Sequence, residues 1–530
     1  MVRKRKSVKK SLKRNSGKNY FEDSLNKKEF LFVLVVVLVV SLVGNIVLYS
    51  GFLSNGEIVM SGPILNPNSP IDINILASFK DLEPQNTWIG MISPVAEDLD
   101  GDGDMELLVL TQPHDPQFND FSTLFILDHF GRIIKKIPSE NCWFDARHFP
   151  SVGDVDGDGL NELVVGSCLG NNGVKFVKIY SNQGILQNEF ISNTYFADEL
   201  YSSMVLYDIN GDGEDELIKA SEKRISPSST IWKGVLEVTD EFGNSLQGFP
   251  VNLEDHYFQV SSPAVGDINL DGNPEIIVSY VAPLLDPRKL KVVAISSQGN
   301  ILWSNEFEDK TLGDPIIANV DMDPEYEIII TSTNGIRAFN HDGSLLFEKL
   351  LGNNFIHSNP VVADIDLDGD LEIVFGYRFS IYALDGNGNI LLQKSIPWTM
   401  FPPLIANLDN DPQLEILYNS VDDNLLGEIL AYNLDGSNVR GFPKRMGEEV
   451  AYTAPLLSDI DGDGIMELIS STTWLPETSD GNIYKWDLKQ APSNRYWQTY
   501  QYNNRHTGFY GCLTNRDCSL GETCVNGFCE

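Results

Sequence analysis

The chain has 530 residues, a hydrophobic content of 42% and a formal net charge of −37, a composition typical of a folded protein rather than a disordered one. The charge is uneven, because residues 1–28 carry eleven Lys and Arg, whereas residues 29–530 carry 27 basic and 73 acidic side chains. A body this acidic repels nucleic acid and anionic lipid, so no nucleic acid is expected as a partner, and it attracts cations.

Residues 30–50 are predicted to form a single transmembrane helix. Phe30 to Tyr49 contains only two polar side chains, Ser41 and Asn45, and at ~1.5 Å per residue it covers about 30 Å, one hydrocarbon thickness. The basic tail, residues 1–29, precedes this span, which predicts a cytoplasmic N-terminus in the cell membrane and an extracellular remainder. The alternative is a cleaved signal peptide, which is disfavoured by the long apolar run and by the lack of an A-x-A-like site after it.

One motif recurs eight times beyond residue 73, at intervals of 43 to 59 residues: an acidic loop followed by an apolar strand. Each repeat contains four β-branched and aromatic runs bounded by Gly and Asn, for example 261–268, 275–280, 290–296 and 301–307. Repeats of this length with four strands predict propeller blades. We therefore predict an all-β fold, a β-propeller of eight four-stranded blades over residues 73–490, with seven blades and an irregular unit as the alternative.

The two ends of the repeat region predict how the ring closes. The last repeat has a third strand at 482–488 but no fourth strand before residue 491, and an apolar run at 73–79 precedes the first repeat without a partner. We predict that this run supplies the missing outer strand of the last blade, because that removes an open edge. Residues 51–72 are then a linker, and residues 491–511 are a closing segment.

Cysteine usage agrees with an extracellular location. A density of four cysteines in residues 512–530 predicts a small disulfide-rich tail with three possible pairings. Zinc is disfavoured because the spacing has no CxxC pair and no His follows. Whether Cys142 pairs with Cys168 is left open. The predicted disulfide cysteines are Cys512, Cys518, Cys524 and Cys529.

The acidic loops are predicted to bind calcium. In the second loop, carboxylates stand at positions 1, 3, 5 and 9 (Asp154, Asp156, Asp158 and Glu162), with Gly159 at position 6. Calcium takes six to eight oxygen ligands at about 2.3–2.6 Å. Three alternate side chains, the position-7 carbonyl and a bidentate Glu supply six oxygens, and Gly permits the sharp turn. Without a cation these carboxylates repel one another and take up protons.

All eight loops follow this spacing, so up to eight calcium ions are expected. Magnesium is disfavoured because it keeps its waters. The loops that start at Asn319 and Asn407 have Pro324 and Pro412 at position 6, so they are predicted to turn differently and to bind calcium weakly or not at all. The candidate ligands at positions 1, 3, 5, 7 and 9 are Asp98, Asp100, Asp102, Asp104 and Glu106; Asp154, Asp156, Asp158, Leu160 and Glu162; Asp208, Asn210, Asp212, Glu214 and Glu216; Asp267, Asn269, Asp271, Asn273 and Glu275; Asn319, Asp321, Asp323, Glu325 and Glu327; Asp364, Asp366, Asp368, Asp370 and Glu372; Asn407, Asp409, Asp411, Gln413 and Glu415; and Asp459, Asp461, Asp463, Ile465 and Glu467.

These repeats resemble the FG-GAP/VCBS repeats of integrin α-subunit propellers and of many prokaryotic surface proteins. The resemblance covers about residues 73–490, and residues 497–510 look like an ending that often follows such repeats. It implies a propeller with calcium loops between the first and second strands of each blade. The Phe-Gly and Gly-Ala-Pro signatures of that family are degenerate in this sequence.

In such a family the calcium loops stiffen the blades, so the working surface is expected on the opposite face, where other connections carry aromatic and polar residues. The predicted function is a binding or adhesion module for glycan or protein ligands. The alternatives are a polysaccharide lyase-like enzyme and a structural component of the cell envelope. A lyase needs several cations beside its acidic sugar, and this face is short of Lys and Arg. The ligand-face candidates are Trp88, Trp143, Arg147, Tyr257, His357 and Trp398.

Overall fold

The structure is a computed structural model, in which the chain divides into two compact units, Met1–Pro70 and Ile71–Glu530. The residues that it describes are 53–54, 57–58, 75–78, 87–89, 94–113, 122–140, 142–144, 150–170, 174–195, 203–224, 232–255, 259–282, 288–309, 313–352, 358–377, 379–397, 401–409, 411–422, 426–449, 454–472, 481–488, 503, 506–508, 510, 524–525 and 528–529.

The described part of the first unit is one short hairpin, β1 (Leu53–Ser54) paired with β2 (Glu57–Ile58). The predicted basic tail and the predicted membrane span at 30–50 lie outside the described residues. Within the described residues, no helix is long and apolar enough to cross a membrane.

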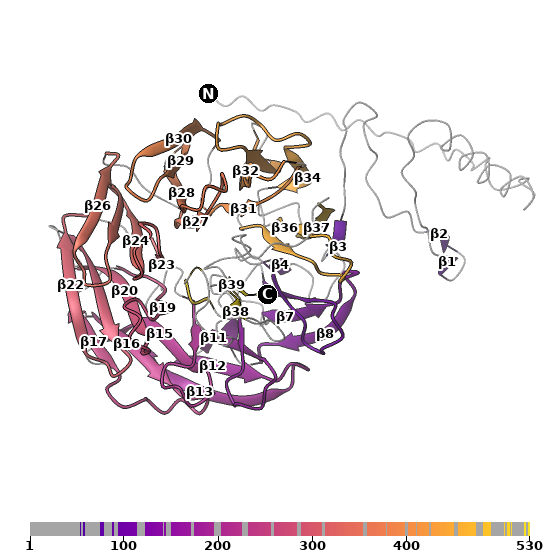
Figure 1. The fold of residues 1–530 in the computed structure, drawn as a ribbon. Helices are drawn as coiled ribbons and strands as arrows, with labels where there is room; N and C mark the ends of the chain where they lie inside the picture. The colour runs from indigo at the N-terminus through magenta and orange to yellow at the C-terminus, as the bar shows by residue number, and fades with distance from the viewer. Residues whose placement is uncertain are drawn as a thin grey trace, which may run out of the picture. The chain divides into compact units, whose positions relative to one another are not determined.

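The second unit is a ring of eight antiparallel sheets, the eight-bladed β-propeller that the repeats predict (Figure 1). The alternative of seven blades is wrong. The innermost strand of each blade is only three residues long. In blade order these strands are β5 (Val95–Glu97), β10 (Ser151–Gly153), β14 (Val205–Tyr207), β19 (Ala264–Gly266), β23 (Ile316–Ala318), β27 (Val361–Ala363), β31 (Leu404–Ala406) and β35 (Leu456–Ser458).

The second strand of each blade is longer, and its residues of described burial are nearly all buried, because each blade packs between two others. These strands are β6 (Glu106–Pro113), β11 (Glu162–Gly170), β15 (Glu216–Arg224), β20 (Glu275–Ala282), β24 (Glu327–Ser332), β28 (Glu372–Tyr377), β32 (Glu415–Val421) and β36 (Glu467–Ser471). The third strands are β7 (Thr123–Leu127), β12 (Val174–Tyr180), β16 (Trp232–Thr239), β21 (Lys289–Ser296), β25 (Gly335–Phe339), β29 (Ser380–Leu384), β33 (Leu426–Tyr432) and β37 (Asn482–Asp487).

The fourth strands form the rim of the ring and alternate between exposed and partly buried residues, as β22 does. In blades one to seven they are β8 (Ile133–Pro138), β13 (Leu186–Tyr195), β17 (Val251–Asp255), β22 (Ile301–Phe307), β26 (Leu345–Leu350), β30 (Ile390–Ser395) and β34 (Lys444–Glu449).

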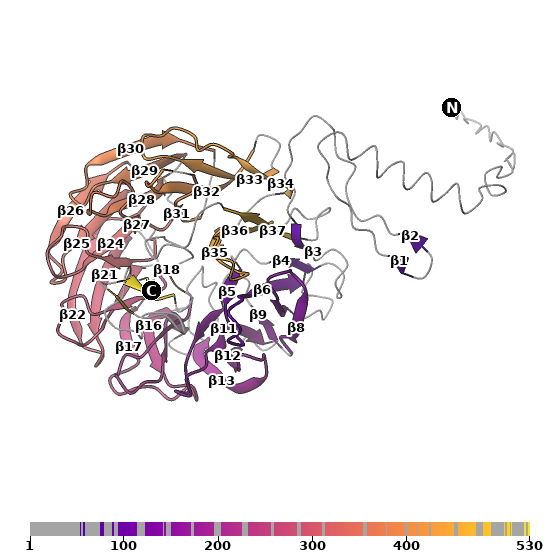
Figure 2. The same ribbon diagram turned by 45° about the vertical axis from the view of Figure 1, so that its right-hand side comes forward.

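The ring closes as predicted. The fourth strand of the eighth blade is β3 (Ile75–Ser78), which pairs with β37 through Ile75 opposite Tyr484 and Ser78 opposite Asn482 (Figures 1 and 2). Side chains of the eighth and first blades share one apolar cluster, in which Phe125 of β7 and Ile483 of β37 are both buried. Other clusters join the remaining neighbours around the ring, and each buried Leu, Ile or Phe contributes roughly 1.5–3 kcal/mol.

The described part of the closing segment lies against the innermost strands. The carbonyl oxygens of Thr507 and Gly508 accept hydrogen bonds from the backbone N–H groups of Val265 in β19 and Ile317 in β23, both at 2.8 Å. The His506 side chain is fully buried, with its Nε2 3.3 Å from the Pro150 carbonyl oxygen. The segment therefore satisfies inner-strand groups that face the centre of the ring.

Three short strands that the repeat pattern did not predict pair with the second strands of blades one, two and four. They are β4 (Thr87–Ile89) on β6, β9 (Cys142–Phe144) on β11 and β18 (Gln259–Val260) on β20. Cys142 is the ladder partner of Gly170, and Cys168 is the partner of Phe144. In the tail, Cys524 of β38 (Cys524–Val525) lies opposite Cys529 of β39 (Phe528–Cys529), whereas Cys512 and Cys518 lie outside the described residues, so the disulfides stay a prediction.

Candidate metal centres

The eight acidic loops lie where the sequence predicts them, each between the first and second strands of a blade. In every blade the Glu at position 9 is the first residue of the second strand. Its side chain is at most 6% exposed. The loops therefore present their carboxylates at equivalent places around the ring.

The position-9 Glu is anchored in the same way in all eight loops. Its Oε2 accepts a hydrogen bond from the backbone N–H of position 2, at 2.5 to 3.2 Å, as Glu162 does from Val155. One oxygen thus holds the loop closed over the start of the strand. In the third and fourth loops the other oxygen accepts a hydrogen bond from Nδ2 of the position-3 Asn, at 2.6 Å in Glu216 and 3.2 Å in Glu275.

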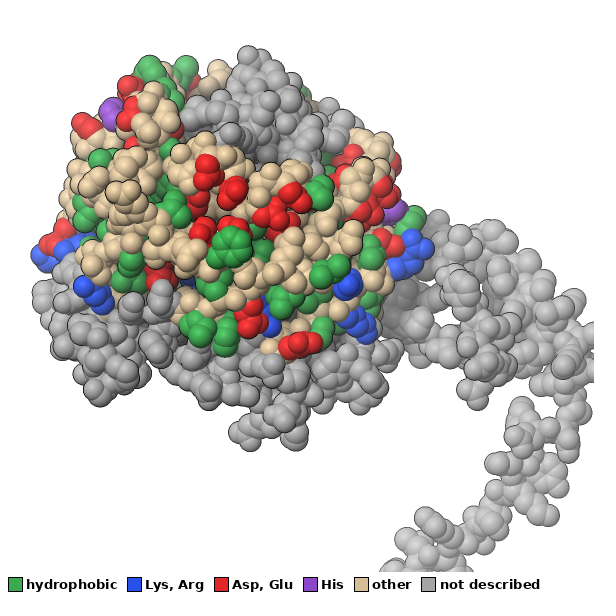
Figure 3. All heavy atoms as spheres, turned by 90° about the horizontal axis from the view of Figure 1, so that it is seen from below, with side chains coloured by type: hydrophobic (Ala, Val, Ile, Leu, Met, Phe, Trp, Pro, Cys, Tyr) green, Lys and Arg blue, Asp and Glu red, His purple; other side chains and the backbone are tan. Residues whose placement is uncertain are grey.

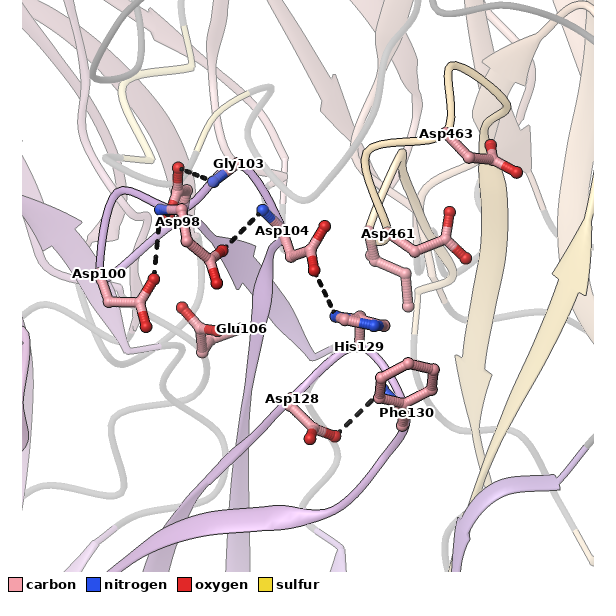
Figure 4. A network of polar contacts seen from close by, with 12 residues as sticks. Asp98, Asp100, Gly103, Asp104, Glu106, Asp128, His129, Phe130, Asp461 and Asp463 are labelled. Atoms are coloured by element: carbon pink, nitrogen blue, oxygen red, sulfur yellow. Dashed lines mark hydrogen bonds and ion pairs between the residues drawn. The ribbon is translucent and has the colours of Figure 1, made fainter.

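The first loop shows how the remaining carboxylates are positioned (Figure 4). The two oxygens of Asp98 accept hydrogen bonds from the N–H groups of Gly101, at 2.7 Å, and Gly103, at 3.1 Å. Asp100 and Asp102 each accept a bond from the N–H group two residues later, at 3.2 and 2.9 Å. Gly103 has φ of +96°, a left-handed conformation that Gly adopts without strain.

This arrangement brings carboxylates close enough to share an ion. In at least five loops, one oxygen from each of three acidic residues lies within 4.8 Å of the others. Two of these sets belong to the loops with Pro at position 6, which sequence reasoning expected to be weak. The sets are Asp98, Asp100 and Glu106; Asp154, Asp156 and Glu162; Asp321, Asp323 and Glu327; Asp364, Asp366 and Glu372; and Asp409, Asp411 and Glu415.

The two Pro-containing loops are built differently, as predicted, and the structure shows how. In the six loops with Gly at position 6, its N–H donates to Oδ2 of the first Asp at 2.8 to 3.2 Å. Proline has no N–H to donate. The first residue in these two loops is Asn, and its Nδ2 donates instead to the position-5 carbonyl, from Asn319 to Asp323 and from Asn407 to Asp411.

Burial and mutual repulsion perturb the position-9 carboxyls. Burial, followed in importance by the charges of neighbouring Asp side chains, raises the pKa of Glu162 to about 8, although the N–H of Val155 opposes this rise. Burial likewise raises the pKa of Glu106 and Glu372 to about 7. Without a cation these loops therefore hold protons near neutral pH.

Several buried oxygens in the loops have no hydrogen-bond partner. Among the described residues these include Glu327 Oε1, Asp364 Oδ1 and Asn407 Oδ1. Buried polar atoms are normally paired, because an unpaired one costs about 1–3 kcal/mol. A set of hard oxygen donors with orphaned atoms fits a hard cation such as Ca²⁺. The third loop has Asn at position 3, and Asn210 Nδ2 donates a hydrogen bond to Glu216 Oε1. A 180° rotation of that amide exchanges its nitrogen and oxygen, so that the oxygen can serve as a ligand of a cation in the loop.

A basic side chain from the third strand lies beside the eighth loop. Nζ of Lys485, on β37, lies 2.7 Å from Asp461 Oδ2, 3.6 Å from Asp487 Oδ1 and 3.9 Å from Glu467 Oε2. Burial lowers the pKa of Lys485, but the hydrogen bond to Asp461 and the three negative charges outweigh it and raise the pKa above the usual value. Spacing alone did not reveal this contact, because Lys485 is 18 residues beyond the end of the loop.

Neighbouring loops also contact one another. The N–H of Met105, in the first loop, donates to the carbonyl of Ile460, in the eighth, at 2.9 Å. At this junction His129 Nδ1 lies 3.0 Å from Asp104 Oδ2, with Asp461 across from them (Figure 4). Figure 3 shows Asp and Glu side chains gathered in patches in the upper half of the visible face, with few Lys or Arg among them.

Only the backbone of two ligand-face candidates can be placed. Trp88 lies on β4 opposite Gln112, and Trp143 lies on β9 opposite Leu169. Both strands join the far end of a second strand that begins with the loop Glu, so they lie on the side of the blade opposite the acidic loops. The other candidates, Arg147, Tyr257, His357 and Trp398, lie outside the described residues.

The comparisons with known proteins identify no family. No family model and no curated protein matches the chain. Solved structures that match include the V. cholerae biofilm matrix protein Bap1, with 14% identity and a TM-score of 0.45, over 82% of this chain and 96% of that chain. Another is the BP39L lectin from Burkholderia pseudomallei, with 10% identity and a TM-score of 0.42, over 68% of this chain and all of that chain.

A third match is a mutant of a puromycin hydrolase, with 14% identity and a TM-score of 0.37, over 73% of this chain and 59% of that chain. At these scores the likenesses transfer no function to this chain. The assignment of eight blades therefore rests on the strand pairing of the chain itself.

The raised pKa of Glu162 predicts a pH dependence in the presence of chelator. Because the folded-state pKa, about 8, lies above the usual 4.5, the stability from the neutral carboxyl is complete below pH 4.5 and is lost as pH rises through about 8. Glu162→Gln cannot ionise, so its melting temperature should fall less than that of the wild type between pH 5 and pH 8.5, as followed by circular dichroism in EDTA.

The matched control is Asp342→Asn. The side-chain and backbone groups of Ser344 lower the pKa of Asp342, so this carboxyl is ionised throughout that range and the difference from wild type should stay constant. Parallel curves for Glu162→Gln and wild type would contradict the expected role of the buried carboxyl.

Proposed function

We propose that the chain is a membrane-anchored, extracellular calcium-binding β-propeller that acts as a binding module for glycan or protein ligands. The calcium part is supported mainly by a position-9 Glu that is anchored in the same way in all eight loops, and by buried loop oxygens that lack hydrogen-bond partners. The predicted span at 30–50 carries the anchoring part, and the predicted disulfide tail agrees with an extracellular location.

Calcium would be held by the carboxylates at positions 1, 3, 5 and 9 and by the carbonyl at position 7. The ion supplies positive charge and rigidity there, and no chemistry. The protein's own groups already orient the ligands, because the N–H of position 2 fixes the Glu and the N–H of position 6 fixes the first Asp. Calcium therefore supports the closed form of each blade.

The support for a binding surface comes from the opposite side of the blades. The long second strands of blades one and two are extended there by β4 and β9, which carry Trp88 and Trp143. A tryptophan on a paired strand is a rigid, amphipathic contact residue, and its ring suits stacking on a sugar or burial against a protein partner.

A glycan array tests this function directly. The full chain, solubilised in detergent micelles and labelled, is applied to immobilised glycans and extracellular proteins in calcium and in EDTA. The proposal expects retention of a defined ligand class in calcium, reduced at least tenfold by Trp88→Ala or Trp143→Ala. Shortening of an acidic polysaccharide during the assay would instead indicate the lyase alternative, and no retention on any surface would argue for the structural role.

A further inference from the structure

The eighth acidic loop has a basic side chain beside it, where each of the other seven has an apolar one. At the same position of the third strand, two ladder rungs beyond the position-9 Glu, Lys485 stands opposite Ile469. The residues at this rung in blades one to seven are all apolar. They are Ile126, Ile179, Val238, Ala294, Ala338, Ala383 and Ala431.

The loop has adapted to this ammonium group. In the first seven loops, Oδ1 of the position-3 residue accepts a hydrogen bond from the N–H of position 5, at 2.9 to 3.3 Å. In the eighth loop, Asp461 directs Oδ2 to Lys485 at 2.7 Å, and its Oδ1 is buried without a partner. The position-3 carboxylate has therefore exchanged its bond within the loop for a bond to the lysine.

We propose that the Lys485 ammonium is the resident cation of the eighth loop, which is therefore braced without metal. This inference rests on the proposed function, since it assumes that the other loops take calcium. The ammonium is within 4 Å of three carboxylates, Asp461, Asp487 and Glu467. A calcium ion in the same loop would meet a like charge a few ångströms away, which opposes binding wherever water is largely excluded.

An ammonium group in place of calcium matters here because the eighth blade closes the ring. Lys485 lies on β37, the strand with which the N-terminal strand β3 closes the ring. A fixed ammonium keeps the closing blade braced at calcium concentrations where the other loops are empty. The propeller would then soften in its metal-dependent blades while the junction of its two chain ends stays closed.

The test counts calcium ions bound per chain, by native mass spectrometry and equilibrium dialysis of the full chain in micelles. Lys485→Met is expected to bind one ion more than the wild type, and Lys485→Gln, which keeps a polar side chain, should do the same if the Met variant folds poorly. Lys394→Met is the matched control, because Nζ of Lys394 contacts the Gly436 carbonyl and no loop carboxylate, so its count should not change.

The converse substitutions need no change at Lys485. Asp100→Ala and Asp461→Ala each remove the position-3 oxygens, in the first and eighth loops; the first should reduce the number of ions bound by one, and the second should leave that number unchanged. The proposal is overturned if the Lys485 variants gain no ion, or if Asp461→Ala loses one. A wild-type chain that binds no calcium would instead refute the proposed function, so the two failures are distinguishable.

Discussion

Removing calcium is expected to lower the melting temperature of the propeller by on the order of 10 °C or more. Each ion that binds only the folded chain stabilises it by about 2.7 kcal/mol when its concentration is a hundred times its Kd, and several such sites add. In EDTA the carboxylates of each loop would repel one another, and buried oxygens such as Glu327 Oε1 and Asp364 Oδ1 would be unpaired. Circular dichroism melts of the full chain in 1 mM calcium and in EDTA measure the difference.

Two controls make this result specific. Magnesium at the same concentration should restore little of the lost melting temperature, because it demands octahedral geometry and retains its waters. Glu162→Gln should reduce the calcium-induced rise in melting temperature by the contribution of one loop. Glu308→Gln, on the rim of the fourth blade and outside the acidic loops, should leave that rise unchanged. Equal melting temperatures in calcium and in EDTA would rule out the metal function of the loops.

The repeat pattern predicted most of the ring. Short apolar runs bounded by Gly and Asn gave β22 its observed limits, 301–307, and a single unpaired run at 73–79 predicted β3, because a sheet edge needs a partner. The loop Glu was also informative, since it stands at the first residue of all eight second strands. These features are local, so they can be recognised from sequence spacing alone.

Other features depend on contacts that spacing does not record. The strands β4, β9 and β18 form because a neighbouring connection pairs with the end of a long second strand. Each is only two or three residues long, which is too short for a sequence pattern that predicts a strand. Asn at position 1 and Pro at position 6 occur together in two loops, and only the structure explains why. Pro has no N–H to donate to the first residue, and the Asn Nδ2 donates to the position-5 carbonyl instead. Lys485 was missed because strand register, and not sequence distance, brings it to the eighth loop.

Replacing residues 71–80 by a Gly/Ser segment of equal length is expected to open the ring. It removes β3, exposes the edge of β37 and uncovers the apolar cluster that Leu76 and Ala77 help to cover. The lost burial and ladder hydrogen bonds amount to about 4–8 kcal/mol. The variant should melt at least 10 °C below the wild type and elute as oligomers in size-exclusion chromatography, since an unpaired strand edge recruits other chains.

A point variant tests the same junction more gently. Gly131, in the turn after β7, has φ of +75°, and a Cβ added there would lie 2.2 Å from the Leu76 carbonyl oxygen, so Gly131→Ala should push β3 away. Gly441→Ala is the matched control, because Gly441 also has a positive φ, +96°, but nothing within 4 Å of an added Cβ. Both variants carry backbone strain of about 1 kcal/mol or more, and only Gly131→Ala should also oligomerise. Equal behaviour of the two variants would mean that β3 does not hold the ring closed.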